Sequence, residues 1–156
     1  MSEINKQDSN LKLGDSIPDV TVNDQNDNAV NLLQEAKSGY ILFFFYPRAL
    51  TPGCTAQACS LRDAYSELQE KGVKIFGVST DTVEKQKKFA DKHSLPYLLL
   101  ADAEKKVIDS FGVPLRNNTS ASRQAFLFKD SKLVWLDTKA STDKQAEDVL
   151  NALEKL

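Results

Sequence analysis

Short apolar runs separated by helical patterns recur along this chain. The most apolar of them, residues 41–45 (Ile-Leu-Phe-Phe-Phe), has the length and aromatic content of a strand buried on both faces. Residues 73–78 and 97–100 are further apolar runs, and each predicts another strand of the same core. Near the C-terminus, runs at 124–128 and 133–137 flank a polar tetrapeptide and predict a hairpin.

A helix is predicted shortly after the most apolar strand. Thr51 precedes Pro52, which places a capping hydroxyl in front of a residue that is well tolerated at the first helical position. Beyond them, apolar or small residues recur at steps of four and three, which is typical of one amphipathic helix that continues to Gly72. The stripe consists of Cys54, Ala58, Leu61, Tyr65 and Leu68.

Capping patterns predict two more helices. Asp81 is followed three residues later by Glu84, which indicates a helix that runs to about His93. Thr142 and Gln145 repeat this pattern in front of a last helix. The apolar stripe of that helix consists of Ala146, Val149, Leu150 and Leu153.

The remaining segments complete an α/β pattern. Residues 20–22 and 30–32 surround an Asn/Asp-rich turn and predict an N-terminal hairpin. Residues 103–111 predict a brief helix, and residues 115–122, rich in Asn, Ser and Thr, predict a loop. Strands that alternate with helices, followed by a terminal hairpin and helix, predict a three-layer α/β domain. A mixed sheet of thioredoxin-like topology fits this order.

Composition and charge restrict the possible functions. The 156 residues, 41% of them hydrophobic, suffice for one domain over residues 13–156, after a polar segment 1–12 that we expect to be flexible. A net charge of -2 gives no reason to expect a nucleic-acid or anionic-membrane partner. No run resembles a membrane span or an export signal, so we expect a cytoplasmic protein. In a reducing cytosol, two cysteines indicate a reactive pair rather than a structural disulfide.

Cys54 is the candidate nucleophile, because it falls in the first turn of the predicted helix. Free backbone N–H groups and the positive end of the helix dipole favour a negative charge there, and therefore a thiolate. The hydroxyl of Thr51, three residues earlier, can face the same ligand, although plain N-capping also explains this threonine. The alternative for Cys54 itself is a buried, inert thiol.

The spacing from Cys54 to Cys59 has a structural consequence. Five residues along an α-helix put Cys59 about 140° around and roughly 7.5 Å up the axis, a Cα separation of about 8–9 Å. A disulfide tolerates at most about 6.8 Å. If the two cysteines bond, the first turns of this helix must unwind, so we expect a reduced helical form and an oxidised, locally unfolded form. The alternative is that Cys59 is a second core cysteine.

Local motifs point to a known family. Residues 45–47 read Phe-Tyr-Pro and residues 51–54 read Thr-Pro-Gly-Cys, with the second cysteine five positions further on. The spacing Pro-x-x-x-Thr-x-x-Cys and the sequence Leu-Arg-Asp at 61–63 complete the pattern. Together they resemble a peroxiredoxin of the bacterioferritin co-migratory (PrxQ-type) group. The resemblance runs from about Leu13 to the C-terminus and implies a thioredoxin-like fold with an added N-terminal hairpin.

The resemblance implies a thiol-dependent peroxidase. Cys54 would attack hydrogen peroxide or a small organic hydroperoxide, and the resulting sulfenic acid would condense with Cys59 as the resolving cysteine. An external dithiol, which the family implies is thioredoxin, would then reduce the disulfide. No metal, haem or other cofactor is needed. Resolution within one helix removes the need for a partner subunit, so we expect a monomer.

The peroxide must also be positioned, and charge must be stabilised as its O–O bond breaks. We assign this task to Thr51, Arg123 and the backbone N–H groups near Gly53, while the fixed φ of Pro47 shapes the pocket wall. In the family, an arginine in front of such a strand reaches the nucleophile and stabilises its thiolate. This chain has Ala125 where the family usually has Ser or Thr, and the alternative for Arg123 is a solvated surface charge.

Other functions remain as alternatives. A thiol–disulfide oxidoreductase on the same fold would have Cys-x-x-Cys, whose sulfurs can bond without unwinding the helix. A redox sensor or chaperone-like binding protein could use the same switch without turnover, and a structural protein would have inert thiols. Two cysteines and the single His93 do not make a plausible zinc site.

Overall fold

The computed structural model describes residues 11–156. Most of the segment 1–12, predicted to be flexible, lies outside the described residues. The two residues of it that are described are hydrogen-bonded: the N–H of Leu11 donates to the carbonyl of Phe111 at 3.4 Å, and the N–H of Lys12 donates to Asp15 Oδ2 at 2.8 Å.

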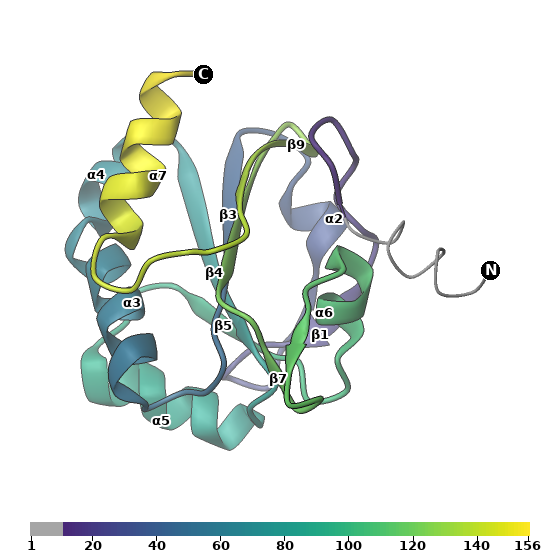
Figure 1. Ribbon diagram of the computed structural model, residues 1–156, viewed down its shortest axis with the longest axis vertical. Helices are drawn as coiled ribbons and strands as arrows, with labels where there is room; N and C mark the ends of the chain where they lie inside the picture. Colours follow the sequence, from purple (N-terminus) through teal and green to yellow (C-terminus); the bar gives the residue numbers. More distant parts are fainter. Residues whose placement is uncertain (1–10) are drawn as a thin grey trace.

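Helices and strands alternate over most of this range (Figure 1). In chain order they are β1 (Thr21–Asn23), β2 (Ala29–Asn31), α2 (Leu32–Glu35), β3 (Tyr40–Phe45), α3 (Pro52–Asp63), α4 (Tyr65–Glu70), β4 (Val73–Ser79), α5 (Val83–His93), β5 (Leu98–Ala101), α6 (Lys106–Phe111), β6 (Leu115–Arg116), β7 (Ser120–Ala121), β8 (Gln124–Lys129), β9 (Lys132–Asp137) and α7 (Gln145–Glu154).

The main sheet has five strands in the order β5-β4-β3-β8-β9, with β3 in the middle. β3 runs parallel to β4 and antiparallel to β8, and Phe43 pairs with Phe76 on one side and Phe126 on the other. The sequence prediction of a mixed, thioredoxin-like sheet is therefore confirmed. Residues 41–45 are all buried, as expected for a strand covered on both faces.

Figure 1 shows three layers: α3, α4, α5 and α7 cover one face of the sheet, and α2 and α6 cover the other. Side chains of successive β3 residues point to opposite faces, so they supply two separate hydrophobic cores. Leu42 and Phe44, together with Tyr46 just beyond the strand, pack in the core that contains Cys54. Phe43 and Phe45 pack in the other core, against Phe111 and the β1–β2 hairpin.

Two predicted elements differ from the observed ones. The expected single helix up to Gly72 is divided at Ala64, whose φ of -99° and ψ of 10° end α3 and begin α4. The apolar stripe continues from α3 across this break to Leu68 in α4, so periodicity alone does not reveal the break. Residues 115–122 are not a plain loop: β6 and β7 pair across Asn117 and Asn118, both in the left-handed conformation that asparagine tolerates.

The predicted caps are also partly wrong. Thr82, not Asp81, caps α5 by accepting a hydrogen bond from the N–H of Lys85 at 3.3 Å. The carboxylate of Asp81 is used elsewhere, as described below. The last helix starts at Gln145 without a capping side chain of its own, and Thr142 lies ahead of it. One short helix, α2, was not predicted, because its single turn follows the hairpin directly.

Asp102 gives the fold a pH dependence. It is buried at the end of β5, and its carboxylate accepts hydrogen bonds from the N–H groups of Val107 and Ile108 in α6. Burial raises the pKa of Asp102 to about 6, in spite of these bonds. The native state therefore binds a proton more tightly than the unfolded chain, so stability falls as pH rises through the window from about 4 to 6.

We expect wild type to lose about 2–3 kcal/mol of unfolding free energy between pH 4 and pH 7 relative to Asp102→Asn, which does not titrate. Urea unfolding of both proteins at the two pH values measures this difference, since all other groups titrate alike in both. Parallel pH profiles for the two proteins would contradict the assignment.

Candidate active site

The loop from Tyr46 to Thr51 connects β3 to α3 and is anchored by the side chain of Asp81. The carboxylate of Asp81 accepts a hydrogen bond from the backbone N–H of Ala49 at 2.6 Å and another from the hydroxyl of Ser79 at 2.6 Å. Both the carboxylate and Ala49 are buried. Asp81 therefore fixes the middle of the loop that carries Pro47 and Thr51.

Thr51 occupies the N-cap position of α3, as predicted, with Pro52 as the first helical residue. Its hydroxyl makes no capping bond; it donates instead to the carbonyl oxygen of Arg48 at 2.8 Å. Leu50, just before it, has a φ of 69° and is 40% exposed, so the chain turns sharply in front of the helix. The lone pairs of the Thr51 oxygen stay available to accept from a ligand at the helix start.

Cys54 lies in the first turn of α3 as a free thiol, and its side chain is 1% exposed. The Nη1 of Arg123 donates to its Sγ at 3.6 Å. Gly53 makes room for this contact, because a Cβ at that position would lie 3.1 Å from Arg123 Nη2. The structure thus brings together Cys54, Gly53 and Arg123 from the sequence prediction.

Arg123 is held in place by a second side chain that the sequence prediction did not include. It precedes β8, and its Nη1 also donates to Gln57 Oε1 at 2.7 Å. Gln57 lies three residues after Cys54 on the buried side of α3 and is 0% exposed. Its Nε2 donates in turn to Gln145 Oε1 in α7 at 2.7 Å. The signal available from the sequence was a polar residue three positions after Cys54, on the same side of the helix as the apolar stripe.

Tyr46 belongs to the core rather than to an open pocket. It is 0% exposed, packs against Phe44 and Phe89, and donates its hydroxyl to Gln86 Oε1 at 2.6 Å. Burial raises the pKa of Tyr46, so the phenol stays neutral. Pro47, next to it, is half-buried at the start of the loop.

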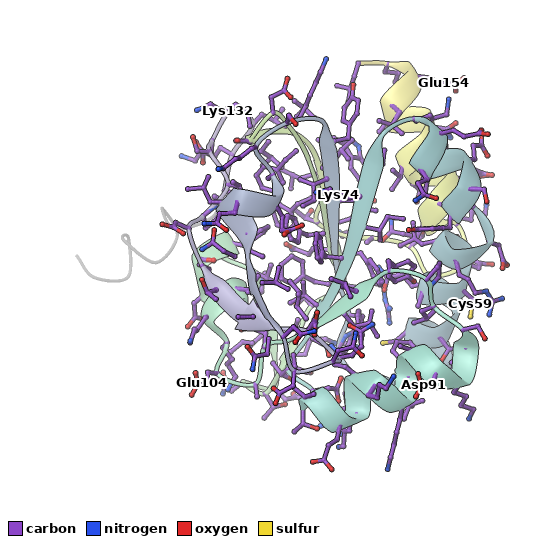
Figure 2. All side chains as sticks on the ribbon, turned by 180° about the vertical axis from the view of Figure 1, so that it is seen from behind. Cys59, Lys74, Asp91, Glu104, Lys132 and Glu154 are labelled. Atoms are coloured by element: carbon purple, nitrogen blue, oxygen red, sulfur yellow. The ribbon has the colours of Figure 1, made fainter. Side chains whose placement is uncertain are left out.

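Cys59 is a half-buried free thiol in the same helix as Cys54. Figure 2 shows it near the edge of the molecule, above the helix that carries Asp91. The carbonyl of Ala58, one residue earlier, accepts a hydrogen bond from the hydroxyl of Tyr97 at 2.6 Å. Because α3 is continuous from Pro52 to Asp63, the two cysteines are separated by regular helix.

The other charged residues considered from the sequence are exposed or have partners other than Cys54. Arg48 is exposed, and Arg62 pairs with Asp63 and donates to the carbonyl of His93 at 2.8 Å. His93 stays at the end of α5, as predicted. Within residues 11–156, no group of three or more His, Cys, Asp or Glu side chains could hold a metal ion. Over the same residues, no helix is both long and apolar enough to cross a membrane.

The fold and the motif match one protein family. Residues 13–135 match the AhpC/TSA family. The chain is 46% identical to Peroxiredoxin Bcp of Escherichia coli (strain K12) over 103 residues, which are 66% of this chain and 65% of that relative's length. It is 34% identical to Peroxiredoxin Bcp of Bacillus subtilis (strain 168) over 153 residues, which are 94% of this chain and 97% of the relative.

Solved structures agree with this assignment. The crystal structure of Peroxidoxin BcpB from Mycobacterium tuberculosis superposes with a TM-score of 0.85 at 34% identity, covering 94% of this chain and 98% of that chain. The crystal structure of a cysteine-to-serine mutant of Xylella fastidiosa PrxQ, at 19% identity and a TM-score of 0.86, covers 93% and 96% and shares the fold. The chain belongs to the AhpC/TSA family, and its relatives at 34% and 46% identity are peroxiredoxins named Bcp.

Proposed function

We propose that this protein is a thiol-dependent peroxidase that reduces hydrogen peroxide and small organic hydroperoxides. The observation that carries the proposal is the position of the Cys54 thiol, in the first turn of α3 with the guanidinium of Arg123 at 3.6 Å. A helix N-terminus and a fixed cation both favour a thiolate, the form of cysteine that attacks peroxides.

The proposed reaction has two steps within the chain. The Cys54 thiolate attacks one peroxide oxygen and the O–O bond breaks, which leaves a sulfenic acid and releases an alkoxide or hydroxide that takes up a proton. Arg123, the Thr51 hydroxyl and the N–H groups of the first turn of α3 orient the peroxide and stabilise the departing oxygen, while Pro47 shapes the wall. The Cys59 thiol then attacks the sulfenic sulfur, forming a disulfide and releasing water.

A dithiol reductant completes the cycle by transferring its two electrons to the disulfide. We propose thioredoxin, on the strength of the relatives' family. We also propose that the protein acts as a monomer in the cytoplasm, since resolution within α3 needs no second subunit and reactive thiols suit a reducing compartment. Sedimentation at micromolar concentration tests the oligomeric state separately from the chemistry.

The test of this function is sustained turnover. A catalytic amount of the protein is mixed with hydrogen peroxide, thioredoxin, thioredoxin reductase and NADPH, and the oxidation of NADPH is followed by absorbance. We expect many equivalents of NADPH to be consumed per protein, with no consumption when the protein is omitted. Oxidation that stops after one equivalent, with thioredoxin and with dithiothreitol alike, would instead indicate a redox sensor.

The helix imposes a structural condition on the disulfide. Its cysteines are about 8–9 Å apart at Cα in regular helix, and a disulfide tolerates at most about 6.8 Å. We therefore expect oxidation to unwind the first turns of α3, so that backbone amides from Thr55 to Leu61 exchange with deuterium much faster in the disulfide form. Amides of β3 serve as the internal control, and unchanged protection in α3 of the oxidised protein would contradict the prediction.

A further inference from the structure

A directed series of hydrogen bonds connects the candidate nucleophile to the C-terminal helix. Arg123 Nη1 donates to Cys54 Sγ and to Gln57 Oε1, and Gln57 Nε2 donates to Gln145 Oε1. Gln57 and Gln145 are both 0% exposed. The series therefore runs from the Cys54 sulfur through the half-buried Arg123 and two buried amides to the first residue of α7.

The orientation of both amides follows from the arginine. A guanidinium only donates, so Gln57 must present its carbonyl oxygen to Arg123. The Gln57 amide nitrogen then faces α7, and Gln145 must present its own oxygen. This arrangement leaves Gln145 Nε2 buried without a hydrogen-bond partner among the described residues. A buried donor without a partner destabilises the fold, and an apolar side chain at residue 145 would avoid that cost. The presence of glutamine therefore indicates that its side-chain carbonyl oxygen has a role.

We infer that Gln145 is a positioning residue: its carbonyl oxygen fixes the rotamer of Gln57, and Gln57 holds the guanidinium of Arg123 against Cys54. The start of α7 is well placed for this role. The N–H of Ala140 donates to the carbonyl of Arg123 at 3.1 Å, and the N–H of Ala146 donates to Ser60 Oγ of α3 at 3.0 Å. The segment that leads into α7 is thus hydrogen-bonded to Arg123, and the start of α7 is hydrogen-bonded to α3, which carries Cys54 and Gln57.

The consequence for catalysis rests on the proposed function, whereas the effect on the thiol does not. Without a side-chain acceptor oxygen at residue 145, the Gln57 side chain can adopt other rotamers. The guanidinium of Arg123 then spends less time within hydrogen-bonding distance of Cys54 Sγ. The thiolate then loses part of its stabilisation, and the guanidinium is also less well placed for the departing oxygen.

The test uses the Cys59→Ser protein as parent, so that Cys54 is its single thiol. Gln145→Leu removes the acceptor, Gln145→Glu keeps an acceptor oxygen, and Val149→Ala is the matched control, since Val149 is buried in the same helix but makes no bond in this series. Two quantities are measured: the rate of alkylation by iodoacetamide as a function of pH, and the second-order rate constant for oxidation by hydrogen peroxide. Gln145→Ala replaces the leucine variant if that one does not fold.

We expect Gln145→Leu to move the alkylation profile toward higher pH and to slow oxidation about three- to tenfold, with Gln145→Glu close to the parent. Parent-like values for Gln145→Leu, or equal changes in Val149→Ala, would overturn the inference. If the alkylation profile shifts as expected while the parent itself does not react with peroxide, the positioning role stands and the proposed function fails.

Discussion

Replacing Cys54 by serine is expected to reduce peroxide turnover about 10³-fold or more, because a serine hydroxyl does not ionise near neutral pH and offers no comparable nucleophile. The substitution exchanges one buried atom, so the fold should persist. The measurement is NADPH consumption in the thioredoxin-coupled assay, with circular dichroism to establish that both proteins are equally folded.

Cys59→Ser is the matched control for this prediction. It removes a thiol of the same helix but leaves the nucleophile, so the variant should still react once with peroxide while its turnover with thioredoxin is lost. Substantial turnover in Cys54→Ser would show that another group attacks the peroxide. Full turnover in Cys59→Ser would show that the reductant attacks the sulfenic acid directly.

Replacing Arg123 by methionine is expected to lower kcat/KM for hydrogen peroxide about 10²-fold. The guanidinium is a fixed charged donor 3.6 Å from the sulfur, and removing such a donor from a site where charge develops typically costs two to three orders of magnitude, of which we take the lower end (about 10²) because the helix N-terminus remains. Methionine retains most of the side-chain length and packing, so the loss reports on charge rather than on a cavity.

Arg48→Met is the control, because Arg48 is close to Cys54 in sequence but its side chain is exposed. It should stay within about twofold of wild type, as expected for a surface charge screened by solvent. Equal losses in the two variants would mean that the net positive charge near the site matters and that the particular contact of Arg123 does not.

Much of this fold could be predicted from the sequence, because its strands are short and strongly apolar. Residues 41–45 become the middle of the sheet, and the hairpin of β8 and β9 lies where its flanking runs placed it. Features that depend on one side chain's choice of partner could not be predicted. Asp81 has the chemistry of a cap, but its carboxylate bonds to Ala49 and Ser79, so Thr82 caps α5 instead.

The candidate site shows the same division. The place of Cys54 in the first turn follows from local rules for helix starts. The approach of Arg123, 69 residues further along the chain, came only from the family resemblance, and the geometry now puts it at the sulfur. The contacts of Gln57 and Gln145 depend on how α3 and α7 pack, which no local pattern specifies.

The most direct test of the account is the intact mass of the reduced protein after one equivalent of hydrogen peroxide, measured beside Cys54→Ser and Cys59→Ser. If Cys54 attacks the peroxide and Cys59 resolves the sulfenic acid, wild type loses two hydrogens, Cys54→Ser is unchanged, and Cys59→Ser gains one oxygen. Unchanged masses in all three proteins over several minutes would contradict the account, and would leave a peroxiredoxin fold whose cysteines do not react with peroxide.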